Sequence, residues 1–394
     1  MSEQPISIYA YPWDLYDEGP EAAARRLAAC GFNTVHLAVS YHLATYLLPR
    51  NPRRSVFFGN TGSVYFRPDP AYYRGTVQPV ITPEAAEIAD ALPQILKALR
   101  AAGISPRAWV VYCYNHALGA AHPHLAKVDA LGNVYTSQLC VGNPRVQALA
   151  RGMTRDILEH YDFDGLFIES LCYLPYRYGF MGHKAAVEPS ERAAFLLGLC
   201  FCDGCRAAAR AQGVDADRLR CEAARWLRDH FSRLPDPDEQ SQKADEAWIA
   251  AAFDGALAAF LAARSRTAAK VIHEVMDLAP AGFTLECFDA GGLSASDAAG
   301  VRRRLHEDCV IIHPGAEVST LTSRAAKMRA GLAEGARVIG ALYPPAFASP
   351  EALNECLAAG TAMSVDGWRV YNYGILSERQ LDWIKRAGWM RPLT

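Results

Sequence analysis

The sequence alternates short apolar runs with longer stretches of helical spacing, and this alternation recurs along most of the chain. Helical stretches such as residues 21–30 and 84–102 stop at a glycine, which is the usual C-terminal cap. Strands that alternate with helices form a parallel sheet covered by helices. The pattern therefore predicts an α/β protein with the fold of a (β/α)₈ TIM barrel. Its strands are expected at residues 6–11, 33–40, 108–114, 162–170, 282–288, 309–313, 337–343 and 368–373.

One interval is too long for a single connection between neighbouring strands. Residues 174–280 contain no convincing strand pattern, and they include a Pro/Asp break at 234–237 and an expected alanine-rich helix at 243–276. We therefore expect one barrel domain over residues 1–394, with a helical insertion at 174–280 after the fourth strand. An alternative makes residues 271–276 a ninth strand, but the fourth strand would then lose its helix, so eight strands are preferred.

Composition narrows the class of protein. The chain has 394 residues, 51% of them hydrophobic, which is enough for a large core. A formal net charge of −2 gives no electrostatic basis for binding nucleic acid or an anionic membrane, and no apolar run reaches membrane-spanning length. The N-terminus has no basic-then-apolar leader, and the eleven cysteines are an odd number scattered mostly in apolar runs. These features predict a cytoplasmic protein, and a homo-oligomer stays open.

Residues 162–170 form an apolar run that ends in a carboxylate. Strand alternation places Gly165, Phe167 and Glu169 on one face. A carboxylate at the C-terminal end of a barrel strand lies at the mouth, where barrel enzymes carry their active sites. The alternative is a buried carboxylate paired with an arginine. The functional interpretation is favoured, because ionisable groups at these strand ends usually belong to active sites.

The other predicted strand ends carry mainly aromatic, imidazole and amide side chains. Aromatic rings stack on the apolar faces of sugars, while His and Asn bind hydroxyl groups, so this composition indicates a carbohydrate site. His36 lies in mid-strand and is equally well explained as a satisfied core histidine. The residues expected to bind substrate are His36, Tyr41, Asn115, His116, Tyr173, His183, His313, Tyr343, Asn372 and Tyr373.

Glu286 supplies a second carboxylate, on the strand next to that of Glu169. Glycoside hydrolysis uses one carboxylic acid to protonate the leaving oxygen and one carboxylate to attack or to activate water. Neighbouring strands lie about 5 Å apart, which suits the shorter spacing of retaining enzymes. The alternative for Glu286 is an inward carboxylate bonded to His313 or to an arginine. We predict that Glu169 and Glu286 face each other as the catalytic pair, with no cofactor required.

Two other functions stay open at this point. A carbohydrate isomerase, epimerase or lyase would use the same carboxylates to move protons beside a carbonyl. A carbohydrate-binding pseudoenzyme would keep the aromatic and imidazole groups without turnover.

Residues 163–169, followed by Cys-Phe-Cys-Asp-Gly-Cys at 200–205, resemble the glycoside hydrolase-like TIM barrels of bacteria, and residues 366–374 look like their last strand. The resemblance implies a glycosidase class of reaction on a small carbohydrate or glycoconjugate. It also implies Glu169 as nucleophile, which leaves Glu286 as acid/base. Those barrels commonly carry Asp at the position of Glu169, so the assignment of the two roles stays open. Tyr373 is expected to line the floor and to bond the nucleophile.

Three cysteines, Cys200, Cys202 and Cys205, have the spacing of thiolates that share a tetrahedral zinc ion. The pattern is similar to the structural zinc cluster of the family 42 β-galactosidases, which adds one upstream cysteine. Cys172 or Cys140 is the expected fourth ligand. The alternative is three thiols that pack at a helix start without a metal. A catalytic metal is disfavoured, because no His-x-His motif marks the first strand.

Overall fold

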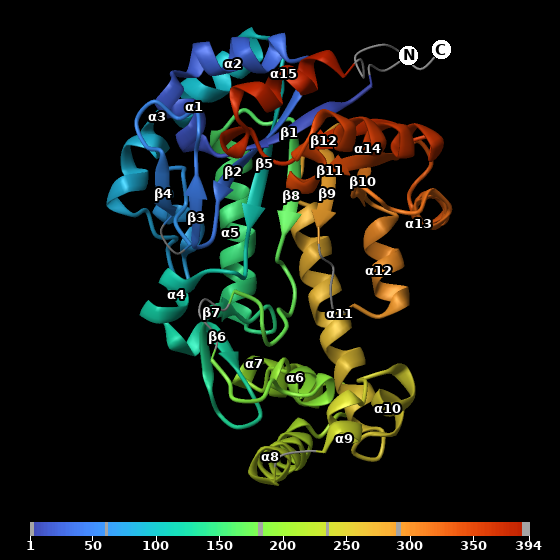
Figure 1. The fold of residues 1–394 in the computed structure, drawn as a ribbon. Coiled ribbons are helices and arrows are strands. Elements are labelled where there is room, and N and C mark those ends of the chain that lie inside the picture. Colours follow the sequence, from blue (N-terminus) through green and yellow to red (C-terminus); the bar gives the residue numbers. More distant parts are fainter. Residues whose placement is uncertain (1–3, 60–61, 180–183, 234–235, 289–292, 388–394) are drawn as a thin grey trace.

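The computed structural model describes residues 4–59, 62–179, 184–233, 236–288 and 293–387 (Figure 1). Eight parallel strands form one sheet in the order β10-β11-β12-β1-β2-β5-β8-β9. The two ends of this order also meet, because the His306 N–H before β10 donates to the Leu285 carbonyl of β9 at 2.9 Å. The sheet is therefore a nearly closed barrel, and the predicted TIM-barrel fold is confirmed.

All eight predicted strands are present, with shifted ends. The third begins three residues before the predicted Ala108, and the last ends at Val370, three residues before the predicted Tyr373. In register, Glu169 lies opposite Phe288 of the neighbouring strand. The strands are β1 (Ile6–Ala10), β2 (Thr34–Ser40), β5 (Ser105–Val111), β8 (Gly165–Glu169), β9 (Thr284–Phe288), β10 (Glu307–Ile312), β11 (Arg337–Leu342) and β12 (Gly367–Val370).

Helices surround the barrel. Local signals define their ends: Asn143 caps α5 by accepting from the Arg145 N–H at 3.0 Å, and Pro144 occupies the first helical position. The helices of the outer layer are α1 (Pro12–Glu18), α2 (Pro20–Ala29), α3 (Pro83–Ala101), α5 (Pro144–His160), α11 (Ala256–Met276), α12 (Ala295–Arg302), α13 (Val318–Gly331), α14 (Pro350–Ala362) and α15 (Glu378–Arg386).

Helix α11 lies between α5 and α12 and contains residues 271–276, so the nine-strand alternative is wrong. The helix expected from residue 243 begins only at Ala256. Phe253, Asp254 and Gly255 all have positive φ angles of 53°, 54° and 80°, which a right-handed helix cannot contain.

The described residues between β8 and α11 form helices joined by loops and contain no strand. These helices, their loops and α11 share an apolar cluster that includes Phe201, Leu227 and Phe260. In Figure 1 these helices lie beyond the C-terminal ends of β5 and β8. The 174–280 boundaries of the insertion stay a prediction. The helices are α6 (Glu191–Leu197), α7 (Asp203–Arg210), α8 (Ala216–Arg233), α9 (Pro237–Ser241) and α10 (Glu246–Ala251).

Two antiparallel hairpins interrupt the connections after β2 and β5. The first pairs β3 (Ala44–Leu47) with β4 (Val56–Gly59), within the long loop expected at residues 41–73. The second pairs β6 (Ala126–Val128) with β7 (Val134–Leu139). Short helical turns complete the connections: η1 (Pro70–Tyr73), α4 (His116–Ala121), η2 (Pro123–Leu125), η3 (Pro344–Phe347) and η4 (Tyr373–Ile375). Among the described residues, no helix combines the length and apolarity that crossing a membrane requires.

Candidate functional site

Glu169 is the last residue of β8, and its carboxylate lies at the C-terminal end of the barrel. The Trp109 indole N–H of β5 donates to Glu169 Oε2 at 2.5 Å, which stabilises the ionised carboxylate. The next residue, Ser170, has a φ angle of 56°, a left-handed conformation that costs a non-glycine residue about 1–2 kcal/mol. Strained backbone is concentrated at functional sites, so the strain at Ser170 supports a functional role for the neighbouring Glu169.

Tyrosine side chains gather beside this carboxylate. The Tyr41 and Tyr371 hydroxyls lie 3.4 Å apart, and Tyr11 Oη bonds to them at 3.1 and 2.8 Å. The Tyr343 ring stacks on that of Tyr371 with a centroid distance of 5.0 Å. Burial, with a further contribution from the nearby Glu169 charge, raises the pKa of Tyr41, Tyr343 and Tyr371. These hydroxyls therefore stay protonated at neutral pH and can donate to a substrate.

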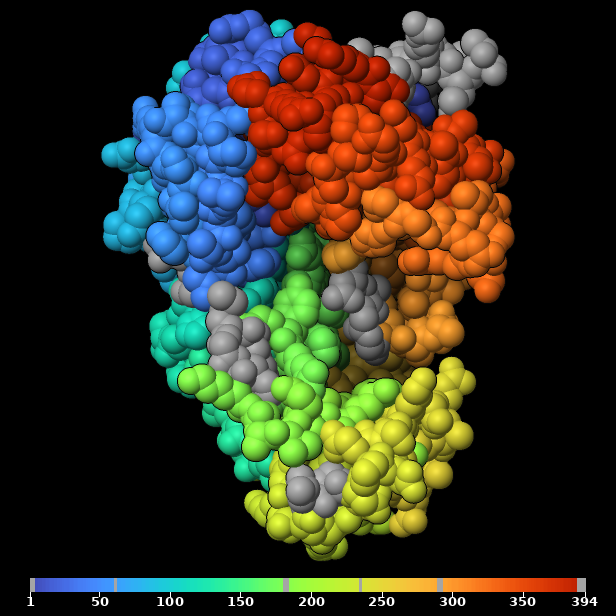
Figure 2. All heavy atoms as spheres, viewed as in Figure 1, coloured from blue at the N-terminus to red at the C-terminus, as the bar shows by residue number. Residues whose placement is uncertain are grey.

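The mouth also contains His42, which was not among the predicted substrate-binding residues. Its ring lies between Tyr41 and Tyr114, at centroid distances of 4.2 and 4.4 Å. His42 Nδ1 lies 2.9 Å from the Leu43 carbonyl, which assigns the proton to Nδ1 and leaves Nε2 as an acceptor. Burial lowers the pKa of His42, so the ring is neutral at pH 7. Figure 2 shows the surface recessed where the chain after β8 passes between the two halves of the barrel.

Glu286 lies one layer deeper than Glu169. It sits opposite Phe167, two residues before the end of β8, and is 1% exposed. Glu286 Oε1 accepts from Arg107 Nη1 at 2.6 Å, and its other oxygen forms an ion pair with Arg369. The structure thus differs from the prediction that the two carboxylates face each other across the mouth. The arginine-paired alternative is the arrangement found.

The charges around Glu286 also oppose a proton-donating role. Burial by itself would raise the pKa of Glu286, but Arg369, His36 and Arg107 hold it well below its usual value. Glu307 extends the network, with bonds of 2.7 Å to Arg107 and 3.1 Å to Arg369. This layer is a compensated ionic core, and Glu286 is an anion within it.

His36 belongs to the same core layer, so its predicted contact with substrate is not supported. It is fully buried, and its Nε2 lies 2.8 Å from Glu286 Oε1. Burial lowers the pKa of His36 to about 4, so the ring is neutral and its Nε2–H donates to the carboxylate. His36 is therefore a core histidine with a hydrogen-bond partner, which was the alternative to substrate binding.

The residues after β5 have mainly structural partners. Asn115 caps α4: its Oδ1 accepts from the Leu118 N–H at 2.9 Å, and its Nδ2 donates to the Gly62 carbonyl at 3.0 Å. The predicted role of Asn115 in holding hydroxyl groups therefore conflicts with its use as a cap. His116 is the first residue of α4 and is exposed.

The last strand places Tyr371, not Tyr373, beside Glu169. Tyr373 Oη donates to Glu18 at 2.5 Å, and the Arg50 guanidinium lies 4.3 Å from the Tyr373 ring centroid. Tyr373 therefore does not bond the predicted nucleophile. Asn372 is buried, and its Oδ1 caps the following turn by accepting from a backbone N–H at 3.1 Å.

The remaining predicted residues lie in three different places. His313 follows β10 and is exposed. Tyr173 lies at the cysteine cluster, where its hydroxyl is 3.8 Å from Cys205 Sγ. His183 lies outside the described residues.

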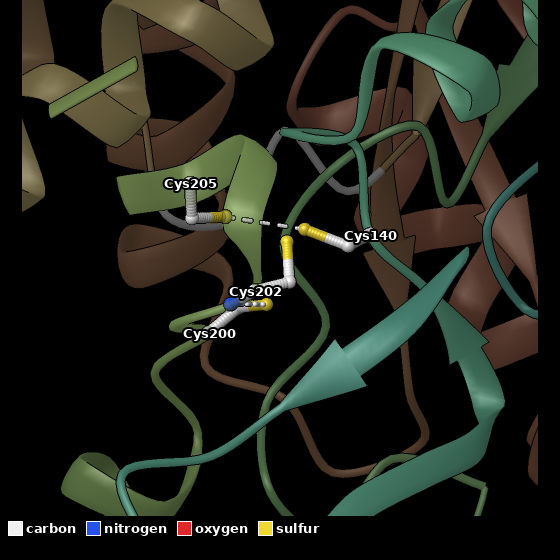
Figure 3. Close-up of side chains that lie close together, drawn as sticks. All are labelled: Cys140, Cys200, Cys202 and Cys205. Atoms are coloured by element: carbon white, nitrogen blue, oxygen red, sulfur yellow. Dashed lines mark hydrogen bonds between the residues drawn. The ribbon is translucent and has the colours of Figure 1, made fainter. Parts of the chain in front are cut away.

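Four buried cysteines converge: Cys140, Cys200, Cys202 and Cys205 (Figure 3). Their Sγ atoms all lie within 4.8 Å of one another, and the Cys140 and Cys205 Sγ atoms are 3.2 Å apart. A tetrahedral zinc ion with Zn–S bonds of about 2.3 Å needs sulfurs about 3.8 Å apart, so the donor set fits. Of the two upstream cysteines considered, Cys140 joins the cluster.

The surrounding backbone donates hydrogen bonds to one sulfur and approaches another closely. The Val128 and Cys202 N–H groups donate to Cys200 Sγ at 3.4 and 3.5 Å. Burial would raise the pKa of Cys200, but hydrogen bonds from the neighbouring groups lower it well below its usual value. A Cβ atom at Gly142 would lie 2.6 Å from Cys205 Sγ, so the close approach requires glycine. The two N–H donors and the lowered pKa favour a thiolate at Cys200.

The sequence matches no family model and no curated protein. Solved structures share the fold at low identity. The α-L-fucosidase isoenzyme 2 from Paenibacillus thiaminolyticus is 12% identical with a TM-score of 0.58, over 98% of this chain and 49% of that one. The PgaB (BpsB) glycoside hydrolase domain from Bordetella bronchiseptica is 12% identical with a TM-score of 0.57, over 98% and 99%. A β-galactosidase from Halorubrum lacusprofundi is 13% identical with a TM-score of 0.56, over 97% and 57%.

Proposed function

We propose that this chain is a glycoside hydrolase whose reaction centre is the Glu169 carboxylate, with a small carbohydrate or glycoconjugate as substrate. The observation that carries the proposal is the position of Glu169 at the end of β8, bonded by the Trp109 N–H and flanked by tyrosine hydroxyls. The three structural neighbours described above are a fucosidase, a glycoside hydrolase domain and a β-galactosidase, and these names support the same reaction class.

The chemistry assigned to each group follows from its surroundings. Glu169, whose carboxylate accepts the indole N–H of Trp109, either attacks the anomeric carbon or activates water. The stacked rings of Tyr343 and Tyr371 offer an apolar face to a sugar, and the Tyr41 hydroxyl offers a donor. Glu286 contributes a fixed negative charge in the core. The sequence predicts a retaining mechanism with two carboxylates, and the anomer of the product tests that prediction.

A panel of aryl glycosides tests the proposal directly. Release of the aryl group, followed by NMR of the sugar product at early times, gives both the activity and the anomer formed. A retained anomer supports attack by Glu169, and an inverted one supports activation of water. Failure to release any leaving group from a panel that covers the common sugars and both anomers would contradict the proposal.

A second candidate is a carbohydrate-binding protein without turnover. It is favoured by one observation, that Glu286 is committed to Arg107 and Arg369. A sugar that binds in calorimetry but is neither cleaved nor converted would support it. Conversion of a free sugar would instead indicate an isomerase, epimerase or lyase.

Replacing Trp109 with phenylalanine should lower kcat/KM by about 10–100-fold, because Glu169 loses its N–H donor while the ring is largely retained. Steady-state kinetics on the best substrate of the panel measure this. The control is Trp226→Phe, which changes an indole of α8 that stacks on His230. Equal losses in the two variants would argue against a specific role for the Trp109 N–H.

We also propose that Cys140, Cys200, Cys202 and Cys205 hold a structural zinc ion. When bound, zinc supplies a crosslink between the chain after β7 and the start of α7. The segments that it joins come from the connections after β5 and after β8, both of which leave the barrel at its C-terminal end.

Metal analysis should find about one zinc ion per chain. Removing it with a strong chelator should lower the thermal midpoint by about 5–10 °C, because binding energy at a structural site contributes to folding. Cys140→Ser should release zinc and lower the midpoint similarly. Cys221→Ser, at an exposed cysteine of α8, is the matched control and should change neither. A protein purified without chelator that contains no metal would contradict the proposal.

A further inference from the structure

Two buried cations lie beside the cysteine cluster. Lys127 of β6 is 2% exposed and Arg264 of α11 is 7% exposed. Lys127 Nζ donates to the Leu174 carbonyl at 3.3 Å and lies 4.1 Å from the Tyr135 ring centroid. The Arg264 guanidinium lies 4.1 Å from the Tyr173 ring centroid, and its Nε atom has no hydrogen-bond partner. Within the part of the chain that the structure describes, neither forms a salt bridge, which is unusual for cations so deeply buried.

Arg264 is connected to the sulfurs through a ring contact, and Lys127 lies near them through its own backbone strand. Arg264 covers the ring of Tyr173, whose hydroxyl lies 3.8 Å from Cys205 Sγ. Lys127 precedes Val128, whose N–H donates to Cys200 Sγ at 3.4 Å. The nearby carboxylate of Asp129 accepts from Asn133 and Tyr135 instead.

The charge of the cluster decides whether these cations have a partner. Beside four neutral thiols, burial lowers the pKa of Lys127 to about 7, and the Arg264 charge stays uncompensated in a region of low dielectric, which is costly. Four thiolates around one divalent ion carry a net charge of about −2. Two buried cations match that charge.

We infer that Lys127 and Arg264 are the charge-compensating residues of the cysteine centre, which stabilise it as a divalent ion held by four thiolates. This inference rests on the zinc site proposed above. It adds the ionisation state of the centre and two residues outside the ligand set that determine its affinity. Groups just outside the ligands typically change metal affinity by about 10–100-fold when they are removed.

Zinc affinity, measured at fixed pH by competition with a chromophoric chelator, tests the inference. Lys127→Met and Arg264→Met should each weaken zinc binding by about 10–100-fold. Lys127→Arg and Arg264→Lys, which keep the charge, should recover most of that loss. The control is Lys270→Met, which removes an exposed cation from α11, and it should leave the affinity unchanged.

A second measurement separates charge from packing. In protein loaded with iron in place of zinc, the tetrathiolate centre carries about −2 when ferrous and −1 when ferric, so nearby cations favour the ferrous form. Lys127→Met and Arg264→Met should therefore lower the reduction potential, and the charge-conserving variants should not. Loss of packing alone would not produce this pattern.

The outcomes are distinguishable. A wild-type protein that binds no metal refutes the zinc proposal. A wild-type protein that binds zinc tightly, with both methionine variants equal to it in affinity and in iron potential, refutes only the charge compensation. The two variants are on different elements, so either one that folds with the wild-type circular dichroism spectrum is sufficient for the test.

Discussion

Glu169→Gln is expected to lower kcat/KM on the best glycoside substrate by about 10³-fold or more, because the neutral amide can neither attack the anomeric carbon nor activate water. The fold should be unaffected, since the amide is nearly isosteric and Nε1–H of Trp109 can still donate to its oxygen. Kinetics on aryl glycosides measure the loss. Glu334→Gln, at an exposed glutamate, is the matched control and should retain full activity.

Glu169→Ala adds a test of the role. If Glu169 is the nucleophile, azide should enter the space left by the side chain, restore part of the turnover and give a glycosyl azide of inverted configuration. If Glu169 activates water, azide in that space would also give the inverted azide, so the anomer formed by the wild-type protein separates the two roles. A Glu169→Ala protein with near-wild-type activity on a confirmed substrate would remove Glu169 from the mechanism.

Glu286→Gln is expected to affect stability more than chemistry. Neutralising Glu286 leaves Arg369 and Arg107 with less compensation in the core, and breaking a buried ion pair costs about 3–5 kcal/mol. The thermal midpoint should fall by about 5–15 °C. The ratio of kcat/KM between substrates with poor and good leaving groups should stay near the wild-type value. A selective loss on poor leaving groups would instead restore Glu286 as the acid/base.

The same network predicts the direction of the pH dependence of stability. The pKa of Glu286 is lower in the folded state than its usual value of 4.5, so its stabilisation is present above that pH and is lost as pH falls through the folded-state pKa. The pKa of His36 is lowered to about 4, so protonation of the unfolded state reduces stability as pH falls from about 6.5 towards 4. Both groups weaken the fold in acid. Chemical denaturation between pH 7 and 4 should show the decline caused by His36, and a further decline below about pH 4.5 should be shallower in Glu286→Gln.

Local sequence signals determined much of this protein. Apolar runs separated by glycine-capped helices were sufficient to predict eight strands and the barrel, because strand and helix periodicities depend on neighbours in sequence. The position of Glu169 was also predictable, since a carboxylate that ends an apolar strand comes at the C-terminal end of a parallel barrel. The spacing of Cys200, Cys202 and Cys205 indicated a shared site for the same local reason.

Tertiary structure alone decided the partners of these groups. Alternation assigns Glu286 to the inward face but not to a height along the barrel, and strand register places it opposite Phe167 among arginines from distant strands. The choice of Cys140 over Cys172 as the fourth thiol depended on where the β6–β7 hairpin brings the chain after β7. Tyr371 lies beside Glu169 because β12 ends at Val370. Contacts between residues far apart in sequence are set by register, strand length and loop path, which no single stretch of sequence contains.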